Sequence, residues 1–541
     1  MKHTFWPLAA LLAFPGAAIA QQAHISRELL NANPGSSVNI IVRYKQPPTG
    51  ASHQRVTELG GRLKHELRLI NGSSYSAPAA SLQTLAADSN VVSISVDHEV
   101  HMLLDNTTAA VNAPAAWSLG WDGSGIGVAV IDSGISEHDD LQGPYGSRVV
   151  YREDFVGGGT TDQFGHGEHV SGILAGNGAD SLCVICSRHF TGIAPNANLL
   201  DLRVLDQNGE GSDSLVISAI ERAIELQAQY NVRVINLSLG RPVFESYTSD
   251  PLCQAVEAAW QAGIVVVVAA GNDGRDDSAN NNGYGTISSP GNDPYVITVG
   301  AMKSMGTPLR YDDRIASYSA KGPTQIDHIV KPDLLAPGNQ VVSLLSPDGN
   351  LQNLYPQNAV PLNYYEWTHQ TQPSTSYFTL SGTSMAAPVV SGAVALLLQA
   401  NPTLTPDQVK ARLMRTAYKK FPQTSIAYDP TTGQSFLSEY DIFTVGAGYL
   451  DIQAALADNT LFQHTALSPT AVYSQGTAHL VCGYLSICAN RWSWNNIPTW
   501  STTAIWGDQS IWGDQSIWGD QSIWGDQSIW GDLNITIEGE N

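Results

Sequence analysis

The sequence predicts an α/β protein built on a mainly parallel sheet, and three observations lead to this fold class. Short apolar runs recur between residues 126 and 302, and segments with helical periodicity lie between several of them. Strands that alternate with helices form parallel sheets covered on both faces. With 541 residues, of which 43% are hydrophobic and 14% charged, the chain can bury a large core of this kind.

The elements of this sheet follow in order along the chain. The predicted strands are IGVAVIDSG (126–134), LLDLRVLD (199–206), RVINLSLG (233–240), GIVVVVAAGN (263–272) and YVITVGAM (295–302). The predicted helices among them are SDSLVISAIERAIELQAQY (212–230) and PLCQAVEAAWQAG (251–263). The apolar segment VVSGAVALLLQA (389–400) is too short to span a bilayer, so we expect a buried core helix there.

A smaller α+β unit is expected before this sheet. Its predicted strands are residues 37–45, 74–78 and 91–102, and its predicted helices are residues 51–70 and 79–90. The alternation of strands and helices that follows fades after about residue 457.

The beginning of the chain resembles an export signal. Lys2 supplies a positive charge, residues 5–14 an apolar run, and residues 18–20 (AIA) a small-residue cleavage site. The alternative, a membrane anchor, is disfavoured because the run is short and is interrupted by Pro7 and Pro15. We therefore expect a secreted or extracytoplasmic protein, with the periplasm and the cell surface as further destinations and no membrane span. The net charge of −22 disfavours nucleic acid and anionic membranes as partners.

Export permits disulfides, and the chain has five cysteines. Cys482 and Cys488 are close in sequence, and we expect them to form a disulfide. Cys183 and Cys186 form CVIC, which fits a tight disulfide, half of a metal site or a redox pair; a structural bridge is favoured because no strand-to-helix junction is evident there. Cys253 lies in a helical pattern and is expected to be a buried thiol.

A hexapeptide repeat, IWGDQS, fills much of residues 501–541. Its tryptophans recur in phase, so an extended chain would carry them all on one face. One interpretation is a low-complexity tail, and the other is a tryptophan-bearing surface for a partner or polysaccharide.

The stretch QFGHGEHVSG (163–172) raises the question of a metal site or a catalytic base. A helical zinc motif needs two histidines four positions apart, whereas His166 and His169 are three apart, so no metal is assigned. Two distant segments offer partners for a base. Asp132 ends an apolar strand, where an unpaired carboxylate is costly, and Ser384 begins an apolar helix.

Asp132, His166 and Ser384 stand in one of the chain orders known for a serine-protease triad. They lie in the motifs VIDSG, GHGEHVSG and SGTSMAAP, and AAGND (269–273) is a fourth motif. On these motifs, residues 103 to 457 resemble the subtilisin-like serine proteases. The resemblance implies a subtilisin-like, doubly wound, mainly parallel sheet and a serine endopeptidase.

The resemblance also implies a role for each motif residue. Ser384 is the expected nucleophile, His166 the base that takes its proton, and Asp132 the carboxylate that orients the imidazole. Asn272 is expected to donate its side-chain amide to the oxyanion. His169 occupies the family's second histidine position, where a structural role is expected. Glu168 departs from the threonine common there, which alters the surroundings of the base without implying inactivity.

The resemblance to the family implies less about substrate binding and metal binding. Ser238, Leu239 and Gly240, together with Ala269, Ala270 and Gly271, match segments that line the family's cleft and pair with an extended protein or peptide substrate. The long stretch 344–378 is expected to form a loop over the cleft, with aromatic side chains available to substrate. The family often binds calcium, but the region after the histidine motif departs from its usual calcium loop, so no cofactor is assigned.

The α+β unit at 36–102 resembles the family's inhibitory propeptide. Such a domain stabilises a slowly folding sheet by binding it and blocks the cleft until it is removed. The expected organisation is a signal peptide (1–20), a propeptide acting as the enzyme's own inhibitor (21–102), the catalytic domain (103–457) and an extension carrying the repeat (458–541). The rival hypothesis is a catalytically silent subtilisin-fold binding or adhesion protein.

Overall fold

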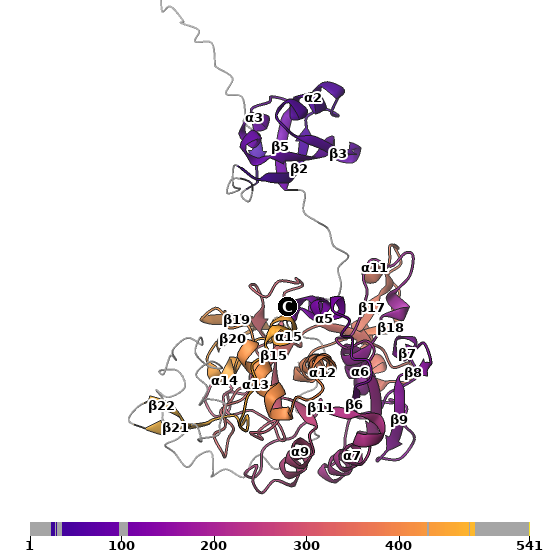
Figure 1. Ribbon diagram of the computed structural model, residues 1–541, viewed down its shortest axis with the longest axis vertical. Coiled ribbons are helices and arrows are strands. Elements are labelled where there is room, and N and C mark those ends of the chain that lie inside the picture. Colours follow the sequence, from indigo (N-terminus) through magenta and orange to yellow (C-terminus); the bar gives the residue numbers. More distant parts are fainter. Residues whose placement is uncertain are drawn as a thin grey trace, which may run out of the picture. The chain divides into compact units, whose positions relative to one another are not determined.

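The computed structural model describes residues 23–26, 29, 35–96, 106–429, 432–474, 477–481 and 540. The chain forms two compact units, Met1–His101 and Met102–Asn541 (Figure 1). The expected signal peptide, the pair Cys482 and Cys488, and the hexapeptide repeat lie outside the described residues.

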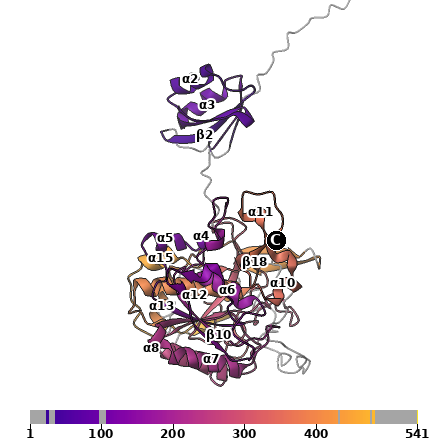
Figure 2. The same ribbon diagram turned by 90° about the vertical axis from the view of Figure 1, so that its right-hand side faces the viewer.

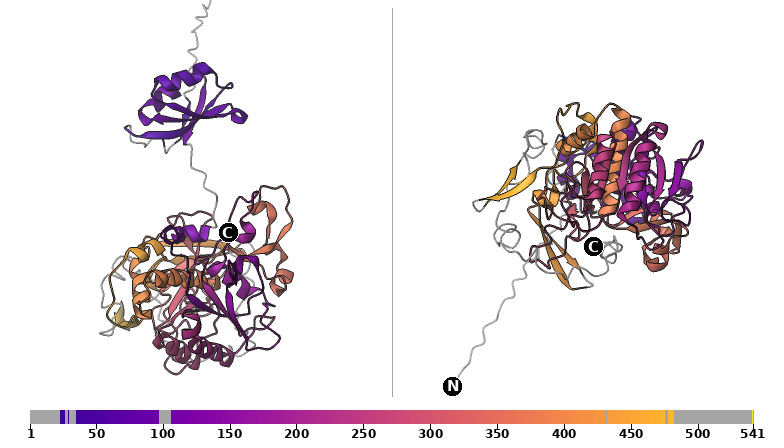
Figure 3. Two further views of the ribbon diagram at one scale, coloured as in Figure 1. Left: turned by 45° about the vertical axis from the view of Figure 1, so that its right-hand side comes forward. Right: turned by 90° about the horizontal axis from the view of Figure 1, so that it is seen from below.

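The first unit is a five-stranded sheet in the order β1-β5-β2-β4-β3. Its strands are β1 (His24–Ile25), β2 (Ser37–Tyr44), β3 (Arg62–Leu67), β4 (Gly72–Pro78) and β5 (Val91–Val96). Helices α2 (Gly50–Glu58) and α3 (Leu82–Ala86) cover one face of this sheet (Figures 2 and 3). Ile40, Tyr75 and Ile94 are fully buried between the layers. The predicted α+β fold of this unit is confirmed.

One element of this unit was predicted wrongly. The helix expected over 51–70 ends at Glu58, and residues 62–67 form strand β3 instead. Gly60 has a φ of 82°, a left-handed conformation that stops a helix at little cost. Strand β3 lies at the edge of the sheet and is almost wholly exposed, so its side chains lack the alternation that marks a half-buried strand.

The second unit contains an eight-stranded sheet in the order β14-β13-β12-β11-β6-β10-β9, with β15 also paired to β13. Its strands are β6 (Gly127–Asp132), β9 (Val149–Asp154), β10 (Asn198–Arg203), β11 (Val232–Leu237), β12 (Val265–Ala269), β13 (Ile297–Lys303), β14 (Arg314–Ile315) and β15 (Leu334–Pro337). All pairs are parallel except β13 with β14. The predicted mainly parallel sheet is confirmed. Strands β6, β10, β11, β12 and β13 coincide with the predicted apolar runs, whereas β9, β14 and β15 were not predicted.

Helices cover both faces of this sheet, as expected for a doubly wound fold (Figure 2). On one face lie α7 (Asp213–Glu225), α8 (Gln227–Tyr230) and α9 (Pro251–Gln261), and on the other lie α6 (His166–Ala175), α12 (Thr383–Ala400), α13 (Pro406–Thr416) and α15 (Ile452–Ala457). Among the described residues, α12 alone is long and apolar enough to cross a membrane, but 89% of it is buried inside the protein. It is therefore the predicted core helix, and its apolar residues face neighbouring elements on all sides.

The register of the sheet determines where the functional segments meet. Asp132 at the end of β6 pairs with Arg203 at the end of β10, and Leu237 at the end of β11 pairs with Val268 in β12. The segments that follow β6, β11 and β12 consequently leave the sheet at the same edge.

The stretch 344–378 folds into a small layer of its own. Its elements are β16 (Val341–Leu344), α10 (Asn350–Leu354), β17 (Ala359–Pro361), α11 (Leu362–Tyr365) and β18 (Pro373–Leu380). Tyr365 and Tyr377 are buried against Phe190, with ring centroids 5.5 and 4.6 Å from it. These two tyrosines therefore stabilise the layer, whereas Trp367 is 80% exposed.

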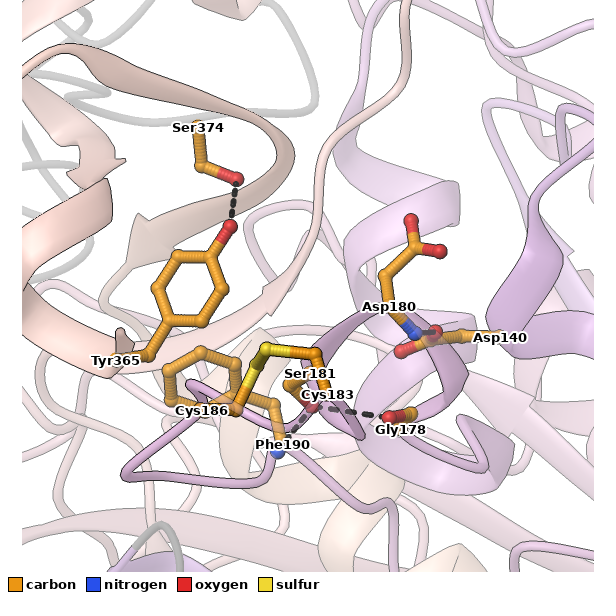
Figure 4. Close-up of a disulfide and its surroundings, with 9 residues drawn as sticks. All are labelled: Asp140, Gly178, Asp180, Ser181, Cys183, Cys186, Phe190, Tyr365 and Ser374. Carbon is orange, nitrogen blue, oxygen red and sulfur yellow. Dashed lines mark hydrogen bonds between the residues drawn. A yellow bond between two sulfur atoms is a disulfide. The ribbon is translucent and has the colours of Figure 1, made fainter. Parts of the chain in front are cut away.

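The CVIC segment lies beside this layer and contains a disulfide between Cys183 and Cys186, whose Cα atoms are 4.9 Å apart (Figure 4). Of the three alternatives for this pair, the structure has the bridge. On one side of the bridge, Ser181 Oγ accepts from the backbone N–H of Phe190, and on the other Tyr365 hydrogen-bonds Ser374. Cys253 is a buried free thiol in α9, as predicted, and burial raises its pKa.

A buried cluster of charges joins the segment just before β15 to α13. Asp333 accepts from Lys331 Nζ (2.7 Å) and lies 3.3 Å from Lys410 Nζ, and all three side chains are fully buried. Ser468 Oγ also donates to Asp333 (2.5 Å). Burial alone would raise the pKa of Asp333, but the two ammonium groups together lower it below its usual value. Burial lowers the pKa of Lys410 to about 7, and the neighbouring Lys331 charge acts in the same direction, whereas Asp333 opposes them.

We predict that Asp333→Asn lowers the free energy of unfolding by about 3–5 kcal/mol, because two buried ammonium groups lose their counter-charge. Urea and thermal unfolding at neutral pH measure this loss. Asp348→Asn, the same change at an exposed loop position, is the matched control and should alter stability little. Equal stability of the two variants would contradict a structural role for the cluster.

Candidate active site

The structure brings together Asp132 and His166, which are 34 positions apart in sequence. Asp132 is the last residue of β6 and His166 the first residue of α6, and His166 Nδ1 lies 2.7 Å from Asp132 Oδ1. Both side chains are buried. Because a carboxylate only accepts hydrogen bonds, Nδ1 carries the proton, and Nε2 is the nitrogen with basic character.

Two local features hold α6 against the end of β6. A Cβ atom at Gly167 would lie 2.3 Å from the carbonyl oxygen of Gly134, so only glycine permits this approach. The carboxylate of Asp162 accepts from the N–H groups of Gly165 (2.7 Å) and Glu168 (2.8 Å) at the start of the helix. Asp162 was not predicted as a site residue, although an acidic residue just before a helix is a usual capping signal.

Ser384 is the second residue of α12 and is tied to the end of β11. Its Oγ donates to the carbonyl oxygen of Ser238 (3.0 Å), and Ser238 Oγ donates in turn to the carbonyl of Ser384 (2.8 Å). The backbone N–H of Ser384 lies in the first turn, where a helix offers its N–H groups no acceptor. Gly382, with a φ of 140°, permits the sharp entry into this turn.

The side-chain amide of Asn272 is oriented by Thr383. Its Oδ1 accepts from the backbone N–H of Thr383 (2.9 Å) and lies 3.1 Å from Thr383 Oγ1. Since Oδ1 accepts from Thr383, Nδ2 points away from those donors within the amide plane. A Cβ built on Gly382 would lie 3.6 Å from this Nδ2 and 3.7 Å from the backbone nitrogen of Ser384, so both donors flank one point.

The two segments predicted to contact substrate leave the sheet from the neighbouring strands β11 and β12. A Cβ at Gly240 would lie 2.6 Å from Ser288 Oγ, and one at Gly271 would lie 3.1 Å from the same atom, so 238–240 and 269–271 converge. The Ala270 N–H donates to Val299 and its carbonyl accepts from Ser288 (both 3.0 Å). Both backbone hydrogen-bonding groups of Ala270 therefore bond within the protein itself.

Comparison with known proteins agrees with this arrangement. Residues 123–445 match the profile of Peptidase_S8, the Subtilase family, over more than half of the chain. The chain is 38% identical to Serine protease AprX of Bacillus subtilis over 370 residues, which cover 66% of this chain and 76% of that relative. It is 33% identical to Subtilisin E of Bacillus subtilis over 385 residues, 70% of this chain and 84% of the relative. An alkaline protease of Alkalihalobacillus alcalophilus is also 33% identical, over 66% of this chain and 76% of its own.

This chain belongs to the subtilase family. It is a subtilisin-family serine endopeptidase, and its substrates are proteins. The family predicted from the four motifs is confirmed.

The second histidine of this subtilase has a structural position, as predicted. His169 Nε2 donates to the carbonyl oxygens of Val341 and Phe378, each at 3.1 Å, and so joins α6 to β16 and β18. Burial and the neighbouring His166 lower the pKa of His169 to about 3, whereas the two carbonyls act in the opposite direction. His169 is therefore a neutral hydrogen-bond donor near neutral pH.

Glu168 is a fully buried carboxyl beside the base. Its Oε2 accepts from the Ser136 N–H (2.5 Å). Burial and the nearby Asp162 raise its pKa well above the ordinary value of 4.5, against the smaller opposing effects of the Ser136 N–H and Arg152. Burial likewise raises the pKa of Asp201, which Arg152 partly offsets from 3.1 Å. Burial therefore favours the protonated form of Glu168, and this burial was not foreseen from the sequence.

Two clusters have the residue types of metal ligands within the described part of the chain. In one, Cys183 and Cys186 are joined in a disulfide and do not act as thiolates. In the other, His138, Asp140 and Asp180 lie within 4.8 Å of one another. Both Asp140 oxygens accept protein donors, the Asp180 N–H (2.8 Å) and the Tyr377 hydroxyl (2.9 Å), and an imidazole is a poor calcium ligand. These residues do not fit calcium, so none is assigned.

We predict that Glu168→Gln stabilises the protein increasingly as pH rises from about 5 to 8. The folded chain holds the Glu168 proton more tightly than the unfolded chain does. Its stability therefore falls as pH rises from about 4.5 through the raised folded-state pKa. Glutamine matches the protonated carboxyl in shape and does not ionise.

Thermal midpoints of Glu168→Gln and the unmodified protein across this pH range measure the effect. Glu221→Gln, an exposed position on α7, is the matched control and should track the unmodified protein. Parallel pH profiles for Glu168→Gln and the unmodified protein would show that Glu168 is ionised in the fold.

Proposed function

We propose that this subtilase is a secreted serine endopeptidase made as a self-processing zymogen, in which Ser384 forms an acyl-enzyme with the substrate. The observation that carries this proposal is the buried 2.7 Å contact between His166 and Asp132. It lies at the sheet edge where the segments after β6, β11 and β12 emerge.

Each proposed role follows from a contact in the site. Asp132 fixes the proton on His166 Nδ1, which makes Nε2 the nitrogen that acts as the base. A hydroxyl has one proton, and that of Ser384 is donated to Ser238, so the Ser384 side chain must rotate before His166 can accept the proton. The alkoxide then attacks the substrate carbonyl, and His166 delivers the proton to the leaving amine. In the second half of the reaction, water attacks the acyl group while His166 takes a proton from the water. His166 then returns this proton to Ser384 Oγ as the acyl group leaves.

The negative charge that develops on the carbonyl oxygen needs donors that are already in position. Asn272 Nδ2 and the Ser384 N–H fulfil this requirement, because Thr383 holds the Asn272 amide and the helix start leaves the Ser384 N–H without an intrahelical acceptor. We expect Leu239 and Gly240 to line the cleft for an extended peptide, with Ala269, Ala270 and Gly271 forming the opposing wall.

Export and zymogen processing rest on separate arguments. The disulfide between Cys183 and Cys186 supports an oxidising compartment, in agreement with the expected signal peptide at 1–20. The unit Met1–His101 has its own buried core and precedes the subtilase domain directly, as an intramolecular inhibitor would. We expect its release by cleavage between about residues 100 and 108.

We predict that Asn272→Leu lowers kcat about 10²–10³-fold with little change in KM, because the lost donor acts on the transition state. Asn272→Asp retains the oxygen acceptor for Thr383 and removes the amide donor, so it should lose activity at least as severely. Steady-state kinetics on a small peptide substrate measure both variants. If Asn272→Asp keeps its activity while Asn272→Leu loses it, the role of Asn272 is to hold Thr383 and not to bind the oxyanion.

We predict that Ser384→Ala abolishes self-processing, since losing the nucleophile lowers turnover about a million-fold. The expected product from a protease-deficient host is a folded chain from about Gln21, which intact-mass measurement identifies. A fluorophosphonate probe should label the unmodified protein and leave Ser384→Ala unlabelled.

Ser218→Ala, an exposed change on α7, is the matched control and should be processed and labelled normally. A Ser384→Ala chain that is still cut near residues 100–108 would assign the cut to another protease. An unmodified chain that is never cut there would refute the propeptide assignment. Absence of labelling in the unmodified protein would favour a silent binding protein.

A further inference from the structure

Glu540, which follows the hexapeptide repeat along the chain, is buried against the subtilase domain. Its side chain is only 2% exposed, although its neighbours in sequence carry the polar composition of a surface segment. A buried carboxylate is costly unless cations and hydrogen-bond donors surround it. The groups that surround Glu540 therefore decide whether the domain has a binding site for this residue.

The carboxylate of Glu540 is held by two cations and a serine. Arg275 Nη2 donates to Oε1 (2.6 Å), and Lys303 Nζ lies 3.5 Å from Oε2. Both the backbone N–H of Ser317 (2.9 Å) and its hydroxyl donate to Oε1. Arg275, Lys303 and Ser317 are themselves at least nine-tenths buried in their side chains or residues.

The backbone of Glu540 is also recognised. Its N–H donates to Asn339 Oδ1 (2.8 Å), and Asn339 Nδ2 donates to its carbonyl oxygen (2.8 Å). A side-chain amide that pairs with both groups of one residue mimics a neighbouring strand, so the contact suits a residue within a peptide segment. The site thus selects a carboxylate side chain and a peptide backbone together.

Other contacts hold the Arg275 side chain toward the site. Arg275 Nη1 donates to Asp429 (3.0 Å), and its guanidinium lies over the ring of Phe436, 4.3 Å from the centroid. Both partners belong to the hairpin β19 (Thr424–Asp429) and β20 (Gln434–Glu439). Arg275 thus binds one carboxylate of the hairpin, that of Asp429, and the carboxylate of Glu540.

The site adjoins two segments that carry proposed catalytic groups. Arg275 follows Asn272 by three positions. Asn339 lies between Gly338, whose carbonyl accepts from the Gly382 N–H (2.8 Å), and Gln340, whose N–H donates to Ser381 Oγ (2.8 Å). An occupant of the site therefore braces both the oxyanion segment and the segment that leads into Ser384.

We propose that Arg275, Lys303, Ser317 and Asn339 form a binding site for a glutamate residue within a peptide segment, and that Glu540 of the same chain is its resident ligand. Glu540, which follows the repeat along the chain, is then held on the subtilase domain. The function of the site is to anchor the extension there.

Hydrogen exchange and thermal unfolding of Glu540→Ala test the proposal, in a full-length chain that carries Ser384→Ala to prevent self-digestion. The Ser317 N–H loses its acceptor in this variant, so its exchange should be at least about tenfold faster, as expected for a lost hydrogen bond to a charged group. The thermal midpoint should fall by about 2 °C. Glu538→Ala makes the same change two positions earlier in the extension and is the matched control.

Accelerated exchange at Ser317 in Glu540→Ala, with normal exchange in Glu538→Ala, is the expected result. Unchanged protection of Ser317 in Glu540→Ala would overturn the proposal, and so would equal losses in the two variants. Glu540→Gln separates charge from shape, because glutamine keeps the hydrogen bonds and removes the attraction of Arg275 and Lys303. It should give an intermediate rate.

Discussion

The hydrogen bond between Asp132 and His166 joins the end of a buried strand to the start of a helix, and the rest of the site is arranged around that junction. A carboxylate at the end of an apolar strand is tolerated only with a partner. Gly167 and Asp162 bring the first turn of α6 within reach of it. The parallel register then delivers the segments after β11 and β12 to the same edge, where Ser238 and Asn272 contact the start of α12.

Four buried carboxyl groups lie close together around the site. Asp132, Asp162, Glu168 and Asp201 all lie near the beginning of α6 or the neighbouring strands, and each is fully or almost fully buried. Asp132 is paired with an imidazole and Asp162 with backbone N–H groups, whereas Glu168 accepts one backbone N–H and burial raises its pKa well above the ordinary value. Burial, hydrogen bonds and neighbouring charges therefore combine differently at carboxyls that lie close together.

Much of the fold was predictable because its signals are local. The buried strands of the parallel sheet are continuous apolar runs, and the four motifs locate the segments at its edge. Strand β3 was missed because an exposed edge strand carries no alternation, and its pairing with β4 is a long-range property. The same reason applies to the cluster of Lys331, Asp333 and Lys410 and to the buried carboxyl of Glu168. Their properties depend on burial by segments far away in sequence, which periodicity does not report.

The contact of Glu540 changes how the extension relates to the domain that carries it. A segment anchored at one end is lost when a single peptide bond within it is cut. A segment held at both ends needs two events, cleavage of the chain and dissociation of the ion pair with Arg275. The second event is an equilibrium, and salt screens the ion pair little because both of its side chains are buried. After a cut in the extension, the distal fragment would therefore remain as a bound peptide, and its release would require loss of the hydrogen bonds to Ser317 and Asn339 together with the ion pair.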